Sequence, residues 1–469
     1  MVIAIIIVFG YNPILRRNAA QSNGFSQTMK KISNFYVTMP DGTIKHANPL
    51  NGTEVWTVST RANRPHNHSK IPSNVLHAIE NENYCDFCQS SYFKTPPEKT
   101  RLIQSSENLF EKIENLTPDR LESSKALFRR IGNLFEIVTY DYWLKNHGFQ
   151  LSPAQNQWKK KYLENPAGRS HVLKMIETKL SLSGRTADEI SKLAEDEKIA
   201  LSNAFFGGAH ELIIAGRHYV SNAQFDNQLC SSGELTPAEH HQFVRFTIDA
   251  MKDIYANNRY VRYVTIFQNW LRPAGASLDH LHKQLVGIDE WGASIESEME
   301  MVRENPNIYN ELVVNFSADH NLIFAENDQA VALAEIGHRY PTLAIYSKSV
   351  HARPEEHTEE EMSGFSDLVH ACHAAMGSQI PCNEEWYFSP RDAIHVMPWH
   401  LLIKWRTINQ AGFEGGTKIY INPVSPEALR DQMVPKLYEL RNAGKIKNLR
   451  IATECELKPN PLLYYKNAQ

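Results

Sequence analysis

The sequence places His280, His282 and Gln284 at alternate positions, just after the small-residue segment Gly275-Ala276-Ser277. In an extended segment alternate side chains point to one face, so two imidazoles and an amide would converge there. Backbone amides of the Gly-Ala-Ser loop could also approach a phosphate closely. A pair of surface or hydrogen-bonded histidines would show the same spacing, so the spacing alone leaves both interpretations open.

Cys85 and Cys88 form a Cys-x-x-Cys pair, which binds one Zn²⁺ when two further ligands come from elsewhere. Buried cysteines or a redox pair are the alternatives, but the flanking sequence lacks the strand and helix of a thioredoxin-like motif. The sequence holds no second Cys-x-x-Cys, so histidines would have to complete a zinc site. His218 and His280 are the leading candidates.

Arg61 and Arg64 offer two guanidinium groups shortly after a predicted hairpin. Each guanidinium fork can make bidentate contacts, so an arginine pair on a loop suits a diphosphate. A solvated loop is the commoner explanation of such a pair.

Strands and helices must position these residues. β-branched and aromatic residues on either side of Pro40-Asp41-Gly42 predict a hairpin. Strand, helix and strand then follow one another twice, from His218 to His282 and from His351 to His400, which indicates an internal duplication. The expected strands are 211–214, 263–267, 322–324, 330–333, 343–346 and 401–405, and the expected helices are about 237–255 and 358–376.

A long stretch from about residue 102 to 205 has a different texture. Charged, helix-forming residues with apolar residues every three or four positions predict a helical insertion. An acidic helix around 296–300 would connect the two halves. We expect residues 1–30 to be an N-terminal extension without ordered structure, because ordinary globular sequence begins near Met29.

Composition excludes several classes of protein. With 42% hydrophobic and 22% charged residues, the chain is neither disordered nor collagen-like. A formal charge of −4, from 49 Lys and Arg against 53 Asp and Glu, gives no global field for binding nucleic acid. The apolar run at 2–9 is too short to cross a bilayer. Six cysteines in 469 residues fit a reducing cytoplasm, where we place the protein.

Several motifs, in order along the chain, resemble the galactose-1-phosphate uridylyltransferase family, the transferase branch of the histidine-triad superfamily. Late motifs look more like the relatives that act as ADP-glucose phosphorylases. The motifs are Asn48-Pro49-Leu50-Asn51-Gly52, Trp56, Arg61-x-x-Arg64-Pro65, Cys85-x-x-Cys88, Glu211 to His218, Phe267-Gln268-Asn269, Gly275-x-Ser277, His280-x-His282-x-Gln284, Phe413-Glu414-Gly415-Gly416 and Tyr420-Ile421-Asn422-Pro423.

The resemblance implies an α+β fold of two histidine-triad-like half-domains with antiparallel sheets and flanking helices. The N-terminal catalytic half would span 31–292 and contain the helical insertion at about 102–205, and the C-terminal half would span 293–469. One structural Zn²⁺ per chain would be held by Cys85, Cys88, His218 and His280. A homodimer is possible.

The resemblance also implies the chemistry. His282 would be the nucleophile, and Gln284 would donate a hydrogen bond to the phosphoryl group, because an amide cannot act as a general acid. The other substrate-binding residues would be Arg61, Arg64, Asn269, Ser277, Phe413 and Glu414. Transfer of a nucleoside monophosphate between a nucleotide sugar and a hexose 1-phosphate, as in galactose metabolism, is the first hypothesis. An ADP-sugar phosphorylase and a catalytically retired, zinc-stabilised nucleotide-binding protein are the alternatives.

The sequence departs from the family pattern in places. Leu281 and Lys283 replace a Pro or Ser and a small residue. Some members bind a second metal in the C-terminal half through three histidines and a glutamate. Here His351, His400 and Glu298 fit three of those places, but Leu402 stands where the last histidine belongs, so we expect that site to be degenerate.

Overall fold

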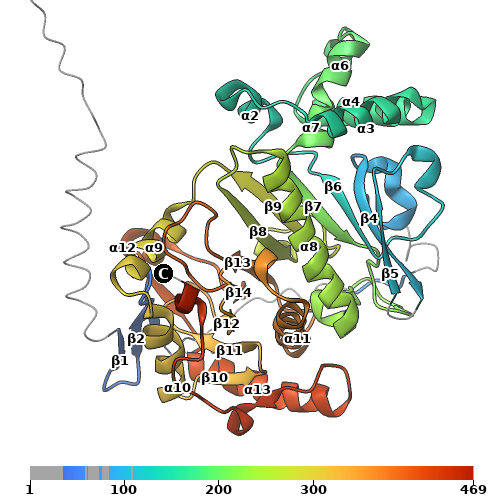
Figure 1. The fold of residues 1–469 in the computed structure, drawn as a ribbon. Helices are drawn as coiled ribbons and strands as arrows, with labels where there is room; N and C mark the ends of the chain where they lie inside the picture. Colours follow the sequence, from blue (N-terminus) through green and yellow to red (C-terminus); the bar gives the residue numbers. More distant parts are fainter. Residues whose placement is uncertain (1–34, 59–60, 62–72, 77–83, 107–108, 468–469) are drawn as a thin grey trace, which may run out of the picture.

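The fold is that of a computed structural model, which describes residues 35–58, 61, 73–76, 84–106 and 109–467. The expected extension at 1–30 lies outside the described residues, and so does Arg64. The described chain is α+β, with antiparallel strands at its centre and helices around them (Figure 1).

The main sheet of the described chain has twelve strands, and each strand pairs antiparallel with its neighbours. The strands predicted near 213, 265, 324, 332, 344 and 403 all form and lie in this sheet. In spatial order they are β16 (Arg450–Ile451), β10 (Ile323–Glu326), β11 (Ala330–Glu335), β12 (Thr342–Ser347), β14 (His400–Trp405), β13 (Cys382–Tyr387), β8 (Tyr263–Trp270), β9 (His282–Ile288), β7 (His210–Ala215), β6 (Phe128–Gly132), β4 (Glu98–Ser106) and β5 (Leu109–Glu114).

A smaller sheet joins the two ends of the chain. The predicted hairpin differs in detail, because the turn at 40–42 leads into an additional strand that separates the two expected ones. The late strand β15 then pairs parallel with β3. The strands are β1 (Tyr36–Thr38), β2 (Ile44–Ala47), β3 (Glu54–Thr57) and β15 (Ile419–Asn422).

Helices α8 and α11 pack on one another against the main sheet (Figure 1). Each is preceded by a threonine whose side chain accepts from the backbone N–H three residues later, and Pro237 occupies the first turn of α8 as expected. The helices are α2 (Tyr140–His147), α3 (Pro153–Glu164), α4 (Pro166–Leu182), α5 (Ala187–Ser191), α6 (Glu195–Leu201), α7 (Asn203–Gly207), α8 (Pro237–Asn257), α9 (Ala293–Glu304), α10 (Phe316–Asp319), α11 (Glu359–Met376), α12 (Gly412–Thr417) and α13 (Pro426–Asn442).

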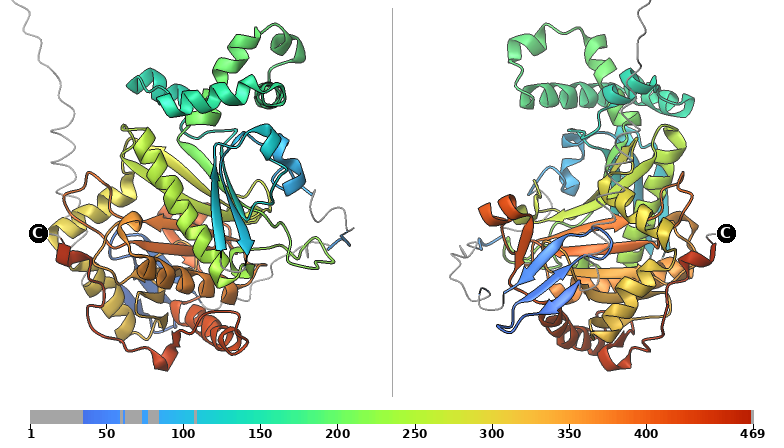
Figure 2. Two further views of the ribbon diagram at one scale, coloured as in Figure 1. Left: turned by 45° about the vertical axis from the view of Figure 1, so that its right-hand side comes forward. Right: turned by 90° about the vertical axis from the view of Figure 1, so that its left-hand side faces the viewer.

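The prediction of helix from residue 102 is wrong for the first thirty residues. Residues 98–132 supply β4, β5 and β6 of the main sheet, and helices run only from 140 to 207, where they project beyond one end of the sheet (Figure 2). Buried ion pairs explain the error, because Arg130 and Lys99 both pair with Glu211 inside the sheet. Because of these charged residues, the sequences of the buried strands β4 and β6 resemble that of a solvent-exposed helix.

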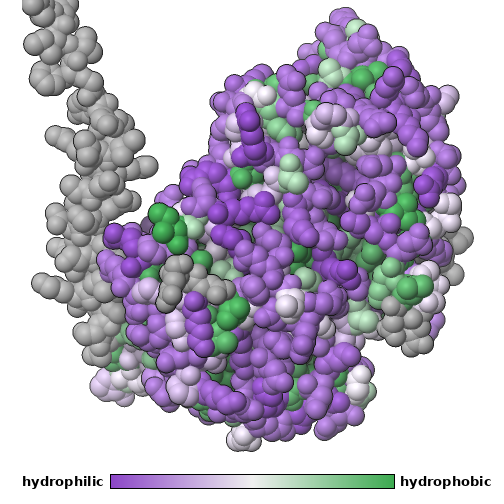
Figure 3. Space-filling view, viewed as in Figure 1, coloured by the Kyte–Doolittle hydropathy of each residue, from purple (hydrophilic) through white to green (hydrophobic). Residues whose placement is uncertain are grey.

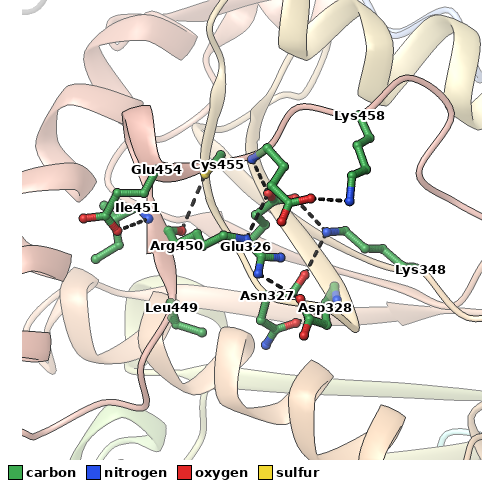
Figure 4. Close-up of polar contacts among 12 residues, drawn as sticks. Glu326, Asn327, Asp328, Lys348, Leu449, Arg450, Ile451, Glu454, Cys455 and Lys458 are labelled. Carbon is green, nitrogen blue, oxygen red and sulfur yellow. Dashed lines mark hydrogen bonds and ion pairs between the residues drawn. The ribbon is translucent and has the colours of Figure 1, made fainter.

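The C-terminal segment covers one edge of the main sheet. Strand β16 pairs with β10, and Arg450 contacts Asp328 at 2.8 Å while Lys348 contacts Glu326 at 2.7 Å (Figure 4).

No helix of the described residues is long and apolar enough to cross a membrane. The face shown in Figure 3 is largely hydrophilic, with scattered hydrophobic residues.

A buried ion pair links the strand of His282 to the second half of the chain. Lys283 on β9 and Glu384 on β13 have fully buried side chains and form an ion pair across the intervening β8. His373 on α11 also contacts Glu384, at 2.7 Å. Although burial raises it, Lys283 and His373 together lower the pKa of Glu384 below its ordinary value.

We expect Lys283→Met to lower the free energy of unfolding by about 3–5 kcal/mol, because it leaves the Glu384 carboxylate buried without its cation. The double variant Lys283→Met/Glu384→Leu should recover most of that loss. Urea unfolding followed by circular dichroism measures both. Lys145→Met, which removes an exposed ion pair with Asp141, is the control and should change stability by about 0.5 kcal/mol or less. Equal effects of Lys283→Met and Lys145→Met would contradict this.

Candidate metal centre and adjoining histidine

Two thiols and two imidazoles from three separate segments converge at one point. The ligand atoms of Cys85, Cys88, His218 and His280 all lie within 4.8 Å of one another. The sulfur atoms are 3.8 Å apart, and the Nδ1 atoms of His218 and His280 lie 3.5 Å from the sulfur of Cys85. The structure thus brings together the four residues that the sequence analysis named as ligands.

These distances fit a tetrahedral zinc ion. Zn–S bonds of about 2.3 Å and Zn–N bonds of about 2.0–2.1 Å place ligand atoms roughly 3.5–3.8 Å apart at tetrahedral angles. The Nε2 atom of His280 lies 2.7 Å from the carbonyl oxygen of Ala215 and donates to it, which leaves Nδ1 with a lone pair for a metal. The cluster could therefore hold a metal such as zinc.

Local structure positions the four ligands. A tight turn brings Cys88 back onto Cys85, with the Cys88 N–H donating to the Cys85 carbonyl oxygen at 3.1 Å. His218 follows β7, and His280 precedes the adjacent strand β9. Hydrogen bonds with Cys85 and the two imidazoles lower the pKa of Cys88, which favours the thiolate that metals bind.

His282 begins β9 two residues after His280. Its Nδ1 lies 2.7 Å from the carbonyl oxygen of His280 and donates to it, so Nε2 carries the lone pair. Burial lowers its pKa to about 4, and the imidazole is neutral at physiological pH. Phe87, from the turn between the two cysteines, packs edge-on at 5.3 Å between ring centroids. The arrangement presents a neutral, oriented imidazole beside the metal cluster.

His210, on β7, holds the Gln284 side chain in one orientation. Its Nδ1 accepts from the Ile137 N–H at 3.0 Å, so neutral His210 carries its proton on Nε2. Nε2 donates that proton to Oε1 of Gln284 at 3.1 Å, and the side-chain amide of Asn133 also contacts Nε2, at 3.0 Å. The amide NH₂ group of Gln284 is then left to donate elsewhere. Sequence analysis missed His210, although strand alternation with Leu212, which pairs with Gln284, could have indicated it.

The remaining predicted substrate residues are dispersed. Asn269 accepts from Asn383 at 2.7 Å and lines a cavity of about 570 Å³ together with Phe267 and Trp291. The side chain of Ser277 is exposed, as is that of Arg61. Phe413 and Glu414 lie on the exposed helix α12, where Glu414 accepts from the backbone N–H of Ala411 at 2.9 Å.

The residues considered for a second metal do not assemble. Glu298 and His400 line one cavity, which Leu402 also lines, whereas His351 does not line it. In the part of the chain that the structure describes, Cys85, Cys88, His218 and His280 form the only group of three or more such residues close enough to hold a metal.

Residues 39–464 match the family described as a domain of unknown function, DUF4921. The chain belongs to this family. This DUF4921 chain is also similar to two curated relatives. It is 23% identical over 175 residues to ADP-glucose phosphorylase of Arabidopsis thaliana, and 25% identical over 223 residues to galactose-1-phosphate uridylyltransferase of Thermotoga maritima. These segments are 36% and 41% of the chain, and they span 50% and 65% of the relatives' own lengths. The relatives confirm the resemblance that the motifs predicted.

A solved structure shares the fold of the DUF4921 chain. The crystal structure of an ADP-glucose phosphorylase from Arabidopsis thaliana with bound ADP-glucose matches with a TM-score of 0.51 at 17% identity. The match covers 83% of the chain and 97% of that structure. It shows the antiparallel α+β architecture.

In this DUF4921 protein, Cys88→Ser should abolish zinc binding and lower the melting temperature, because structural zinc contributes directly to folding. His282→Asn should keep its zinc, since His282 is bonded to the His280 carbonyl oxygen and not to the cluster. Elemental analysis of freshly purified proteins, with differential scanning calorimetry, tests both. Protein without zinc, or zinc loss in the His282 variant that matches the loss in the Cys88 variant, would refute this assignment.

Proposed function

We propose that this protein transfers a nucleoside monophosphate from a nucleotide sugar through a covalent nucleotidyl-histidine on His282. The acceptor is a hexose 1-phosphate. One observation carries the proposal, namely the hydrogen bond from Nδ1 of His282 to the carbonyl oxygen of His280. It aims a neutral Nε2 lone pair away from the backbone, as a nucleophile at phosphorus requires.

In the first half-reaction, Nε2 of His282 attacks the α-phosphorus of the nucleotide sugar. A P–N bond forms, the bond from the α-phosphorus to the bridging oxygen breaks, and sugar 1-phosphate leaves as an anion that needs no acid. The Nδ1 proton stays on the ring, where the His280 carbonyl oxygen stabilises the positive charge of the adduct. In the second half-reaction an acceptor phosphate oxygen attacks the phosphorus, and His282 is released unchanged.

Gln284 supplies stabilisation without acid–base chemistry. Its NH₂ group, oriented by His210, would donate to the phosphoryl oxygens as negative charge concentrates on them. An amide cannot deprotonate water, so transfer is favoured over hydrolysis. Asn269, Ser277, Arg61, Arg64, Phe413 and Glu414 remain proposed substrate residues.

The proposed metal is one structural Zn²⁺ per chain. When bound, it would fix the ligand side chains, and four protein ligands leave no open position for water. Because His280 would be held on its Nδ1 side by the metal and on its Nε2 side by Ala215, its carbonyl oxygen stays in place for His282.

We also propose that the chain contains two histidine-triad-like half-domains that meet at β8 and β13. The order of the main sheet supports this, because β9 flanks β8 as β14 flanks β13. His400 begins β14 as His282 begins β9, and its Nδ1 donates to the carbonyl oxygen two residues earlier, Pro398, at 2.9 Å.

The second candidate activity is an ADP-sugar phosphorylase, with inorganic phosphate as acceptor. The Arabidopsis relative and the structural neighbour carry that name, and both support it. The third hypothesis is a zinc-stabilised nucleotide-binding protein that has lost its catalytic activity. The homodimer and the cytoplasmic location remain predictions.

His282→Asn should abolish a nucleotidyl adduct that the wild-type protein forms with UDP-glucose or ADP-glucose. The asparagine amide is not nucleophilic, whereas its size is similar. Intact-protein mass spectrometry after incubation with each nucleotide sugar gives the answer and also identifies the base. The control is His320→Asn, which changes an exposed histidine at the C-terminal end of helix α10. An adduct that survives in the His282 variant would rule out this nucleophile, and no adduct in the wild type would favour the retired protein.

A substitution at His210 should reverse the orientation of Gln284. With His210→Glu, the new carboxylate would attract the Gln284 NH₂ group and turn its carbonyl oxygen toward the phosphate. We expect kcat to fall about tenfold or more below that of His210→Ala, which only removes the restraint. His210→Gln, which can still donate to Oε1, should retain more activity than either. Single-turnover rates at matched zinc content test this order, and equal rates for the Ala and Glu variants would refute it.

A further inference from the structure

A second cavity, of about 620 Å³, lies over the C-terminal half of the main sheet. Its size is that of a small-molecule site. Strands β12, β13 and β14 form the floor, helix α9 and the β2–β3 turn form the sides, and His400 projects into it from the first position of β14. Three strand spacings separate β9 from β14, and the register places Lys404 level with His282, so His400, four residues further along its strand, lies about 20 Å from His282.

The polar groups of the floor are preorganised. Tyrosine hydroxyls donate to the carboxylates of Glu298, Glu335 and Glu385, each at 2.6 Å. Glu335 also contacts His338 at 2.7 Å, and Glu385 contacts Lys404 at 2.5 Å. The acidic side chains are thus already bonded within the protein, Glu385 to a lysine, Glu335 to His338, and Glu298 to the hydroxyl groups of Tyr309 and Ser294.

His400 lies between two aromatic rings. Tyr346 on β12 and Tyr387 on β13, the two strands beside β14, both stack on its ring. Their ring centroids lie 4.7 Å and 5.1 Å from that of His400, with interplanar angles of 16° and 8°. Its Nδ1 donates to Pro398, and Nε2 has no hydrogen-bond partner in the described part of the chain. A neutral acceptor between aromatic rings suits a hydroxyl group of a ligand.

Two arginines at the cavity wall lack acidic partners among the described residues. Arg339 stacks on Tyr420 at 4.6 Å, and Arg406 stacks on Tyr340 at 4.5 Å. Arg406 donates to the side-chain oxygen of Asn383 at 2.6 Å, but its buried Nε has no partner there. Guanidinium groups held by aromatic stacking and free of carboxylates suit a phosphate.

We propose that this cavity binds a hexose phosphate, with the phosphate on Arg339 and Arg406 and the hydroxyl groups on His400 and the surrounding polar side chains. The site adjoins the one proposed for transfer, because Ala293, Ser294, Asn383, Glu385 and Tyr387 line both this cavity and the cavity that contains Asn269. Arg406 also lines the cavity that contains Asn269, whereas Arg339 and His400 line only the second cavity. Those two residues therefore test the proposal.

Isothermal titration calorimetry on the full-length, zinc-loaded protein is the experiment. The probes are glucose 6-phosphate, fructose 6-phosphate and mannose 6-phosphate, with glucose and inorganic phosphate as references. All three sugars carry their phosphate on C6, so none of them is the hexose 1-phosphate proposed as the acceptor at His282. Binding here and transfer there can therefore fail independently.

At least one of the hexose phosphates should bind more tightly than glucose or phosphate alone. Arg339→Met should weaken that binding about tenfold or more, because a charge-assisted contact is lost at an exposed position where folding is not disturbed. His400→Phe, which keeps the aromatic stacking, should reduce the preference for hexose phosphate over inorganic phosphate. Arg259→Met is the matched control, because Arg259 stacks on Tyr260 at 4.9 Å outside the cavity, and it should bind as the wild type does.

Three outcomes would overturn the proposal. The first is no binding of any of the three sugar phosphates at millimolar concentration. The second is binding that is unchanged in Arg339→Met. The third is binding that requires an added divalent metal and disappears with EDTA, which would make the cavity a metal site.

Discussion

The ion pair between Lys283 and Glu384 determines which way the strand of His282 faces. Side chains alternate along a strand, and Lys283 lies between His282 and Gln284. Because Lys283 is bonded to a buried glutamate on one face of the sheet, its two neighbours must face the other. A shift of one residue in register would leave Glu384 buried without its lysine. It would also turn the side chains of His282 and Gln284 to the face that Lys283 now occupies. The buried ion pair thus fixes the register of β9.

The metal cluster adds a second constraint at the start of the same strand. Cys85 and Cys88 come from a turn that precedes β4, His218 follows β7, and His280 precedes the adjacent strand β9. The residues on both sides of His282 are therefore held in place, His280 by the Cys₂His₂ cluster and Lys283 by its ion pair with Glu384. Together the two constraints preorganise an imidazole that, among the described residues, is hydrogen-bonded only to a backbone carbonyl oxygen.

Sequence patterns predicted the local features well and the buried charges poorly. The ligands of the cluster could be named because a Cys-x-x-Cys pair needs two further ligands and the family resemblance pointed to His218 and His280, and the strands around residues 213 and 265 are rich in apolar residues. Strands β4 and β6 could not be recognised, since Arg130 and Lys99 are charged and their partner Glu211 is distant in sequence. The cavity at His400 was also out of reach, because its lining comes from many separate segments.

The parallel pairing of β15 with β3 has a consequence for the order of folding. Residues 54–57 receive their outer neighbour from residues 419–422, so the small sheet cannot be completed until nearly the whole chain has left the ribosome. Loop-closure entropy over such a separation makes this a late, slow contact. Arg61 lies four residues after the end of β3. A truncated or stalled chain would contain all four residues of the Cys85, Cys88, His218 and His280 cluster and yet lack the strand that completes the sheet before Arg61, so the cluster could assemble before that sheet does.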